Sequence, residues 1–385
     1  MVSTNRGHLR GPSLTFPDLP SGNTLSTPVL VVVAGVLLLG APLSGVWFAG
    51  EPFGPFLEFP PQTGRGASPV FSWIAFWSLA ALIVTAVLPF AWRMFRTLSA
   101  PCAPIDRYTF PIWGWMALLW LVVAWTLAWT RFTGFDAFQQ HTFVPLWLGY
   151  TAVVSALTVQ RKGSSLLTRR PRRFALLFPL SALFWWFFEY LNRFVGNWYY
   201  VGIAELGPIE YTFFATLAFS TVLPAVASTA EWLDTMPRFR QVFGRWHPIQ
   251  IPHPRPVAII VLIVTAFSLA GLGAFREYLY PLVWISPGLV IVALQALAGR
   301  RTVLAPLADG DWCGVATYST AALICGFFWE MWNSGSLAHW EYSIPHVGAF
   351  RLFEMPVLGY AGYLSFGIEC AVIAALALNG EKVKR

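Results

Sequence analysis

The sequence predicts an all-α, polytopic membrane protein of about ten transmembrane helices that contains a parallel internal repeat of helix pairs. Three observations support this prediction: long apolar runs recur along the chain, charged residues make up only 11% of it, and two segments carry the same motif. A soluble globular protein has roughly 25% charged residues. With 56% hydrophobic residues over 385 positions, the chain has too little polar surface for a water-soluble body.

The chain begins with a polar segment, and apolar segments follow it. Residues 1–26 are rich in Ser, Thr, Gly and Pro, which predicts a flexible cytoplasmic tail. This tail is too long and too polar for the n-region of an ordinary signal peptide, so the first apolar run is interpreted as a membrane span. A helix needs about 20 apolar residues to cross a bilayer. The predicted spans are 27–49, 69–92, 110–130, 142–160, 174–195, 209–232, 257–274, 279–299, 314–334 and 352–378.

The distribution of basic residues predicts the orientation. If the N-terminus is inside, the inner loops and ends hold 20 of the 25 basic residues, as the positive-inside rule requires. The outer side then holds Arg65, Arg131, Arg193, Arg276 and Arg351. This asymmetry explains the net charge of +7 without nucleic acid as a partner. Short loops and the lack of a eukaryotic sorting signal favour a multi-pass protein of the bacterial inner membrane, with both termini cytoplasmic.

Two predicted helices end with the same arrangement of a carboxylate and an amide. Glu189 and Asn192 lie near the end of the helix at 174–195, and Glu330 and Asn333 occupy the same places near the end of the helix at 314–334. Residues three apart share one face of a helix. Both helices cross the membrane in the same direction, so the two copies form a parallel repeat.

An aromatic loop follows each copy and leads to a second glutamate, Glu210 or Glu354. The predicted substrate-binding residues are the two amides and four aromatic residues of these loops: Asn192, Asn333, Trp198, Tyr200, Trp340 and Tyr342. The loops can instead serve as aromatic anchors at the membrane interface. In the last helix, a surface of small residues predicts close packing against another helix.

The repeat divides the chain into five segments. The flexible tail at 1–26 precedes a four-helix membrane scaffold at 27–173, where the motif's carboxylate is absent. The first repeat unit is 174–256, an intervening helix pair is 257–313, and the second repeat unit with the C-terminal tail is 314–385.

The repeated carboxylates suggest acid chemistry. A carboxylate in the apolar region costs up to ~3 kcal/mol, so it usually faces a cavity or a partner. A buried carboxyl group that keeps its proton can act as a general acid, and aromatic faces can stabilise a cation. The catalytic candidates are Glu189, Glu210, Glu330 and Glu354. The structural alternative is that glutamate and asparagine bond each other, the loop backbone, Arg193 or Arg351.

No metal site and no cofactor are predicted. Two Glu-x-x-Asn faces offer hard oxygen ligands, but no His or Asp clusters beside them. The chain also lacks a nucleotide-binding glycine-rich loop, a Ser/His/Asp hydrolase pattern and a haem-attachment motif.

The segment from Trp198 to Phe214 resembles the lycopene cyclase domain of the heteromeric type. In that family an aromatic Trp/Tyr loop leads into a Pro-x-Glu-Glu-x-x-Phe-Phe helix start, and the matching run here begins at Pro208 with Glu210 at the first acidic position. Tyr211 occupies the second acidic position. The resemblance implies a small polytopic enzyme in which Glu210 acts as an acid on a carotenoid end group.

These observations favour a membrane-embedded protein that binds or acts on a hydrophobic isoprenoid or lipid substrate near the outer face, in contact with membrane lipids. Whether it is an enzyme stays open. A transporter is one alternative, with Glu231 and Glu369 as candidates for an inward proton path, although paired helix breaks are not evident. The other alternative is a non-catalytic membrane subunit or assembly factor.

Overall fold

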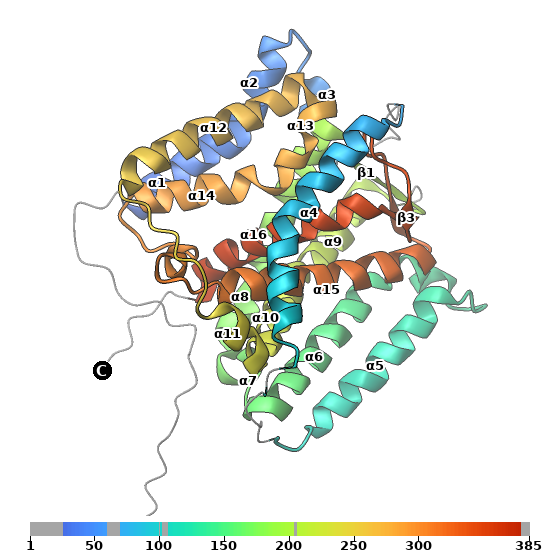
Figure 1. The fold of residues 1–385 in the computed structure, drawn as a ribbon. Coiled ribbons are helices and arrows are strands. Elements are labelled where there is room, and N and C mark those ends of the chain that lie inside the picture. The colour runs from blue at the N-terminus through green and yellow to red at the C-terminus, as the bar shows by residue number, and fades with distance from the viewer. Residues whose placement is uncertain (1–25, 60–69, 100, 102–106, 204–205, 379–385) are drawn as a thin grey trace, which may run out of the picture.

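The computed structural model describes residues 26–59, 70–99, 101, 107–203 and 206–378 (Figure 1). It confirms an all-α fold. Through α8 the elements are α1 (Thr27–Gly35), a π-helix η1 (Val36–Gly40), α2 (Ala41–Phe48), α3 (Gly54–Leu57), α4 (Trp73–Arg96), α5 (Ile112–Trp129), η2 (Asp136–His141), α6 (Phe143–Lys162), α7 (Leu166–Arg169) and α8 (Pro171–Val195). Next come β1 (Trp198–Val201), α9 (Pro208–Phe219), α10 (Val222–Asp234), α11 (Pro237–Phe243), α12 (Pro254–Ala274), α13 (Arg276–Leu279), η3 (Tyr280–Trp284), α14 (Ser286–Leu297) and η4 (Ala305–Asp309). The chain ends with α15 (Cys313–Gly335), β2 (His339–Tyr342), β3 (Arg351–Leu352), β4 (Met355–Pro356), η5 (Val357–Gly359) and α16 (Tyr360–Leu378).

The protein is a multi-pass membrane protein with fewer clearly apolar spans than the ten predicted. Among the described residues, eight helical segments are long and apolar enough to cross a membrane, or nine if one bent pair is a single span. The eight are Pro28–Phe48, Trp73–Arg96, Ile112–Trp129, Phe143–Lys162, Pro171–Val195, Pro208–Asp234, Pro254–Ala274 and Val357–Leu378. The helix predicted at 314–334 forms as α15, but Thr, Tyr, Ser, Glu and Asn residues interrupt its apolar sequence.

The predicted span at 279–299 is broken. Arg276–Trp284 and Ser286–Leu297 meet at an angle of 54°, and this is the one bent pair of candidate spans among the described residues. The cause is local: Pro287 has no N–H to donate to the carbonyl four residues earlier, and its ring crowds that carbonyl.

Four helices, α8, α10, α15 and α16, form the centre of the molecule (Figure 1). On one side α6 packs on α10 and pairs with α5; on the other, α12 packs between α2 and α14. The crossing of α15 and α16 is close, because a Cβ atom at Gly367 would lie 2.3 Å from the carbonyl oxygen of Tyr318. This contact confirms the predicted packing role for Gly367, whereas the other small residues of the same surface, Gly359, Ala361, Gly362 and Ser365, line a cavity.

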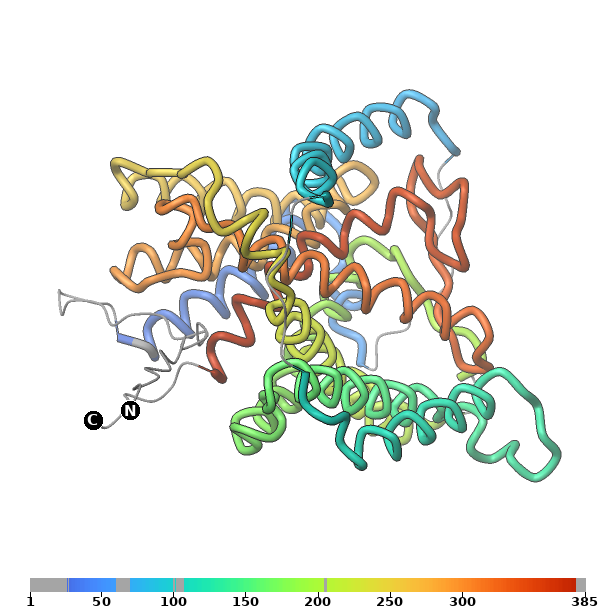
Figure 2. Tube along the Cα trace, turned by 60° about the horizontal axis from the view of Figure 1, so that its bottom comes forward, coloured from blue at the N-terminus to red at the C-terminus, as the bar shows by residue number. Residues whose placement is uncertain are grey.

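Helix α4 crosses the body of the protein largely by itself, as both overall views show (Figures 1 and 2). At one end, Arg93 donates hydrogen bonds to the carbonyl oxygens of Val242 and Arg245, both at 2.6 Å. At the other end, the N–H of Ser72 donates to the carbonyl oxygen of His346 at 2.8 Å. The middle of α4 is therefore held over the central helices by contacts near its ends.

Candidate functional site

The two aromatic loops of the repeat come together as a two-stranded antiparallel ribbon, β1–β2. Trp198 lies opposite Tyr342, and Tyr200 lies opposite Trp340. The tryptophans are equivalent positions of the two copies, and so are the tyrosines, so this register relates the copies by a local two-fold axis through the ribbon. The pairing brings together the four aromatic residues predicted to bind substrate.

In the first copy, Glu189 collects hydrogen bonds from aromatic side chains. Its Oε1 accepts from the Tyr200 hydroxyl at 2.6 Å, the Trp198 indole at 3.0 Å and the Trp185 indole at 3.1 Å. Glu189 is buried, and its Oε2 has no partner among the described residues. The carboxyl group therefore fixes three aromatic rings in place.

The second copy keeps the bond from the ribbon tyrosine but differs in the other donors to the carboxyl group. Oε1 of Glu330 accepts from the Tyr342 hydroxyl at 2.7 Å and from the Tyr363 hydroxyl of α16 at 2.6 Å. The Trp340 indole donates to the Tyr342 hydroxyl at 2.8 Å instead of reaching the carboxylate. Glu330 is fully buried, and its Oε2 also lacks a partner in the described structure.

The two asparagines fasten the loops to the helices that precede them. Nδ2 of Asn192 donates to the carbonyl oxygen of Trp198 at 2.8 Å, and its Oδ1 accepts from the N–H of Asn197 at 2.8 Å. Asn333 exchanges two bonds of 2.7 Å with the backbone of Trp340. Both amides thus bond the loop backbone, which is the structural alternative considered from the sequence.

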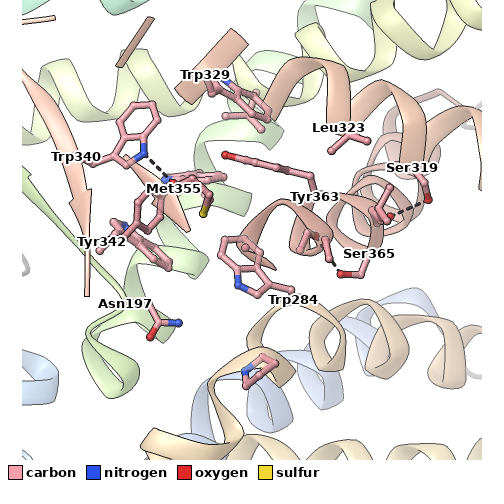
Figure 3. Close-up of a pocket in the computed structure, with 18 of the residues that line it drawn as sticks. Asn197, Trp284, Ser319, Leu323, Trp329, Trp340, Tyr342, Met355, Tyr363 and Ser365 are labelled. Atoms are coloured by element: carbon pink, nitrogen blue, oxygen red, sulfur yellow. Dashed lines mark hydrogen bonds between the residues drawn. The ribbon is translucent and has the colours of Figure 1, made fainter. Parts of the chain in front are cut away.

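A cavity of about 950 Å³ lies beside the ribbon. Its wall includes all four predicted aromatic residues together with residues of α4, α9, η3, α15 and α16. In the close-up, Trp340, Tyr342 and Asn197 lie at one end, and Ser319 and Ser365 lie at the other (Figure 3). Glu189 and Glu330 are not part of this wall. They lie one layer behind it and hold the rings that form it.

The cavity wall is mainly apolar over the part of the chain that the structure describes, and His141 and His339 are its basic side chains. Among its described lining residues there is no Asp, Glu, Lys or Arg. One face of α4 supplies a run of aliphatic and aromatic side chains: Leu79, Leu82, Ile83, Ala86, Val87 and Phe90.

The ribbon tyrosines are set to act as hydrogen-bond donors. Burial raises the pKa of Tyr200 well above its usual value, and the neighbouring Glu189 raises it further. Burial and Glu330 raise the pKa of Tyr342 in the same way. On the opposite wall, burial lowers the pKa of His141, although the charge of Glu210 opposes this shift. Both phenols therefore keep their protons at neutral pH, and His141 is mostly uncharged.

The other two catalytic candidates lie at the periphery. Glu210 is exposed in the first turn of α9. Glu354 is half-buried between β3 and β4, 3.6 Å from Arg351. Neither lines the cavity. The structure thus places Glu189 and Glu330 behind the cavity wall and Glu210 and Glu354 away from the cavity. The four carboxylates therefore do not meet at one point.

Several residues of the site were not predicted. Trp185 lies one turn before Glu189, so helical spacing alone would have placed it on the same face. Tyr363 reaches Glu330 from another helix, and no local pattern signals that contact. Asn197 directly precedes Trp198 in the first copy, and His339 takes the same place before Trp340 in the second.

Glu231 and Glu369 have structural partners. Glu231 accepts from Lys162 at 2.9 Å, from Arg169 at 3.0 Å and from the N–H of Leu166 at 2.6 Å. Oε1 of Glu369 accepts from the N–H of Gly288 at 2.9 Å, at the start of α14. The structure therefore shows Glu231 paired with two basic side chains.

The described residues contain no cluster of three or more His, Cys, Asp or Glu that could hold a metal ion. The comparisons with known proteins add no relative: no protein-family model, no curated protein and no solved structure matches this chain.

Proposed function

We propose that the protein binds an apolar molecule of the isoprenoid or lipid class in the cavity beside the β1–β2 ribbon. The observation that carries the proposal is that aromatic residues from both repeat copies line one mainly apolar cavity of about 950 Å³. This volume is at the upper end of the range of roughly 300–1,000 Å³ for small-molecule sites, which are mainly apolar with a few polar groups. The repeated carboxylates contribute by holding the Tyr and Trp donors of the wall. By the predicted orientation, the ribbon is near the outer face.

An enzymatic form of the proposal uses Glu330 as a proton reservoir behind the wall. The Tyr342 or Tyr363 hydroxyl gives its proton to an unsaturated carbon of the ligand, and a protonated Glu330 then replaces that proton and becomes a carboxylate. The ligand becomes a cation next to Trp and Tyr ring faces, which attract positive charge.

Transport of the same ligand is the second candidate function. The observation that favours it is the broken segment at Ile285, since Tyr280, Trp284 and Ile285 form part of the cavity wall. Discontinuous helices beside a binding site are common in transporters.

A cavity-filling variant tests the binding function. Ala361 of α16 lines the cavity, so Ala361→Trp fills part of its volume. Leu183→Trp adds a Trp at a position of α8 that is 70% exposed and outside the cavity, so it is the matched control. Mass spectrometry of co-purifying lipids is expected to find a specific apolar compound with the wild type and the control, and not with Ala361→Trp. The same bulk lipids in all three samples would contradict the proposal.

The enzymatic form is tested with Glu330→Gln. This variant keeps a hydrogen-bond acceptor for the two tyrosines but has no acidic proton. Unconverted ligand, separated from the compound bound to the wild type by its chromatographic retention, is expected to accumulate in the variant, because uptake and later loss of a proton give an isomer of the same mass. If the wild type and Glu330→Gln hold an identical compound, the protein binds the ligand without converting it.

A further inference from the structure

We infer that the ligand carries an uncharged polar head group that both donates and accepts hydrogen bonds, such as a hydroxyl, and that the side-chain amide of Asn197 binds it. This inference rests on the proposed binding function and specifies the chemistry of the molecule that occupies the cavity.

The backbone of Asn197 is held by both repeat copies. Its N–H donates to Oδ1 of Asn192, and its carbonyl oxygen accepts from the N–H of Ser343, each at 2.8 Å. Just before it, Gly196 ends α8 with a φ of 61°, a left-handed conformation that glycine adopts without strain. The main chain therefore holds Asn197 at the join between the two copies without any use of its side chain.

The Asn197 side chain lines the cavity and is only 1% exposed, yet neither Nδ2 nor Oδ1 has a hydrogen-bond partner. Buried amides in native proteins nearly always have partners, so an unpartnered pair of atoms needs an explanation. Among the described lining residues, no other side chain has a buried polar atom that lacks a partner.

Three other hydroxyl groups of the wall are already engaged. Ser319 donates to the carbonyl oxygen of Leu364 at 2.8 Å, and Ser365 donates to that of Gly362 at 3.0 Å. The Tyr342 hydroxyl both donates and accepts. Asn197 lies beside it, at the opposite end of the cavity from the serines (Figure 3). Asn197 therefore places an unpartnered, buried amide at the ribbon end of the cavity.

The wall selects against charge. A phosphate or carboxylate head group would need cationic partners in this apolar space, and an amine would need an anion at the surface. The described lining residues include no Asp, Glu, Lys or Arg. Of the two histidines in the wall, His141 has a pKa lowered by burial, and His339 lies 3.7 Å from the carboxylate of Glu341. A primary amide offers one acceptor and two donors, which matches a hydroxyl group. The apolar wall along α4 then receives the hydrocarbon chain.

Three probes with the same hydrocarbon chain test the head group: tritiated geranylgeraniol, its monophosphate, and geranylgeranylamine. Equilibrium binding to the purified full-length protein in detergent is expected to be at least tenfold tighter for the alcohol than for either charged probe. Equal or tighter binding of the monophosphate or the amine would overturn the inference while leaving the cavity function intact.

Asn197→Leu tests the residue, because Leu has a similar size without polar atoms and the native side chain makes no hydrogen bond that the fold needs. The affinity for the alcohol is expected to fall about tenfold, while the affinity for a hydrocarbon of the same length stays unchanged. Gln295→Met is the control: it also removes an amide with an unpartnered buried oxygen, but on α14 and outside the cavity. Thermal melting confirms that both variants fold.

The outcomes separate the two proposals. If Asn197→Leu binds the alcohol as tightly as the wild type does, the head-group assignment is wrong and the cavity function stands. If the wild type binds none of the probes and Ala361→Trp retains every co-purifying compound, the cavity function fails, and this inference fails with it.

Discussion

At the residue scale, each repeated glutamate acts on the ribbon through aromatic donors. Tyr342 illustrates this, because its hydroxyl stands between the Trp340 indole and the Glu330 carboxylate. A carboxylate that accepts several hydrogen bonds from stiff side chains fixes their positions, and such networks specify one arrangement of a core. The glutamates therefore determine the shape of the ribbon side of the cavity even though they do not line it.

Tyr342 leads to a prediction about alkaline pH. Burial and Glu330 raise its pKa well above the value of about 10 for a free tyrosine. When folding raises the pKa of a group, the stability that results is complete at pH values below the pKa of the unfolded chain. This stability is lost as the pH rises from there through the pKa of the folded protein. Tyr342→Phe is expected to lower the melting temperature at pH 8, since a hydrogen bond of this kind contributes about 0.5–1.5 kcal/mol. The melting temperature of the variant should also fall less between pH 8 and pH 11 than that of the wild type.

Fluorimetric melting curves in detergent at the two pH values measure both effects. Tyr278→Phe is the control, because Tyr278 is 71% exposed. This substitution should change neither the melting temperature at pH 8 nor its decrease between pH 8 and pH 11. Melting temperatures of the wild type and Tyr342→Phe that fall in parallel between pH 8 and pH 11 would contradict the assignment of the alkaline transition to Tyr342.

At the element scale, the contact between α15 and α16 positions the second half of the site. A Cβ atom at Gly326 would lie 2.3 Å from Cδ2 of Tyr363, whose hydroxyl reaches Glu330. The glycine thus lets the tyrosine ring pass close to α15 and turn its hydroxyl toward the carboxylate. Helix packing and site geometry are linked at this position.

Gly326→Ala is expected to destabilise the protein by about 1–3 kcal/mol, as for an overpacked core, and to displace Tyr363. Gly314→Ala in the same helix is the matched control, because nothing lies within 4 Å of its added Cβ atom. There the better helix propensity of Ala gives a gain of up to about 1 kcal/mol. Thermal melting of both variants measures the difference, and equal melting temperatures would show that α15 and α16 are not packed as closely as described.

At the scale of the whole molecule, the sequence predicted what depends on local pattern. Apolar runs predicted the helices, and three-residue spacing predicted that Glu189 and Asn192, and Glu330 and Asn333, share faces. The ribbon could not be predicted, because its strands are about 140 residues apart in the chain and pair only after the central helices pack. The cavity depends in addition on α4, whose place over the core is set by contacts such as that between Arg93 and Val242.

The ribbon also constrains the path of the chain across the membrane. Helices α8 and α15 both end at it, so an even number of crossings must separate their ends. Helices α9 and α10 make one crossing and α12 makes another. The bent pair and α15 must therefore both cross, or neither does. Since α15 has 23 residues, about 34 Å at 1.5 Å per residue, it is long enough to cross.

The bent pair and α15 are therefore both expected to cross the membrane. Single cysteines test this path when they are introduced into a variant whose four native cysteines are replaced by Ala. Exposed positions on the ribbon side are Glu277 and Arg351, and those on the opposite side are Arg170 and Asp309. A membrane-impermeant maleimide should label Glu277→Cys and Arg351→Cys from one side of sealed vesicles, and Arg170→Cys and Asp309→Cys from the other. Permeabilised vesicles control for reactivity. If Asp309→Cys reacts from the same side as Glu277→Cys, the bent pair returns to the face it entered, and the path deduced from the ribbon is wrong.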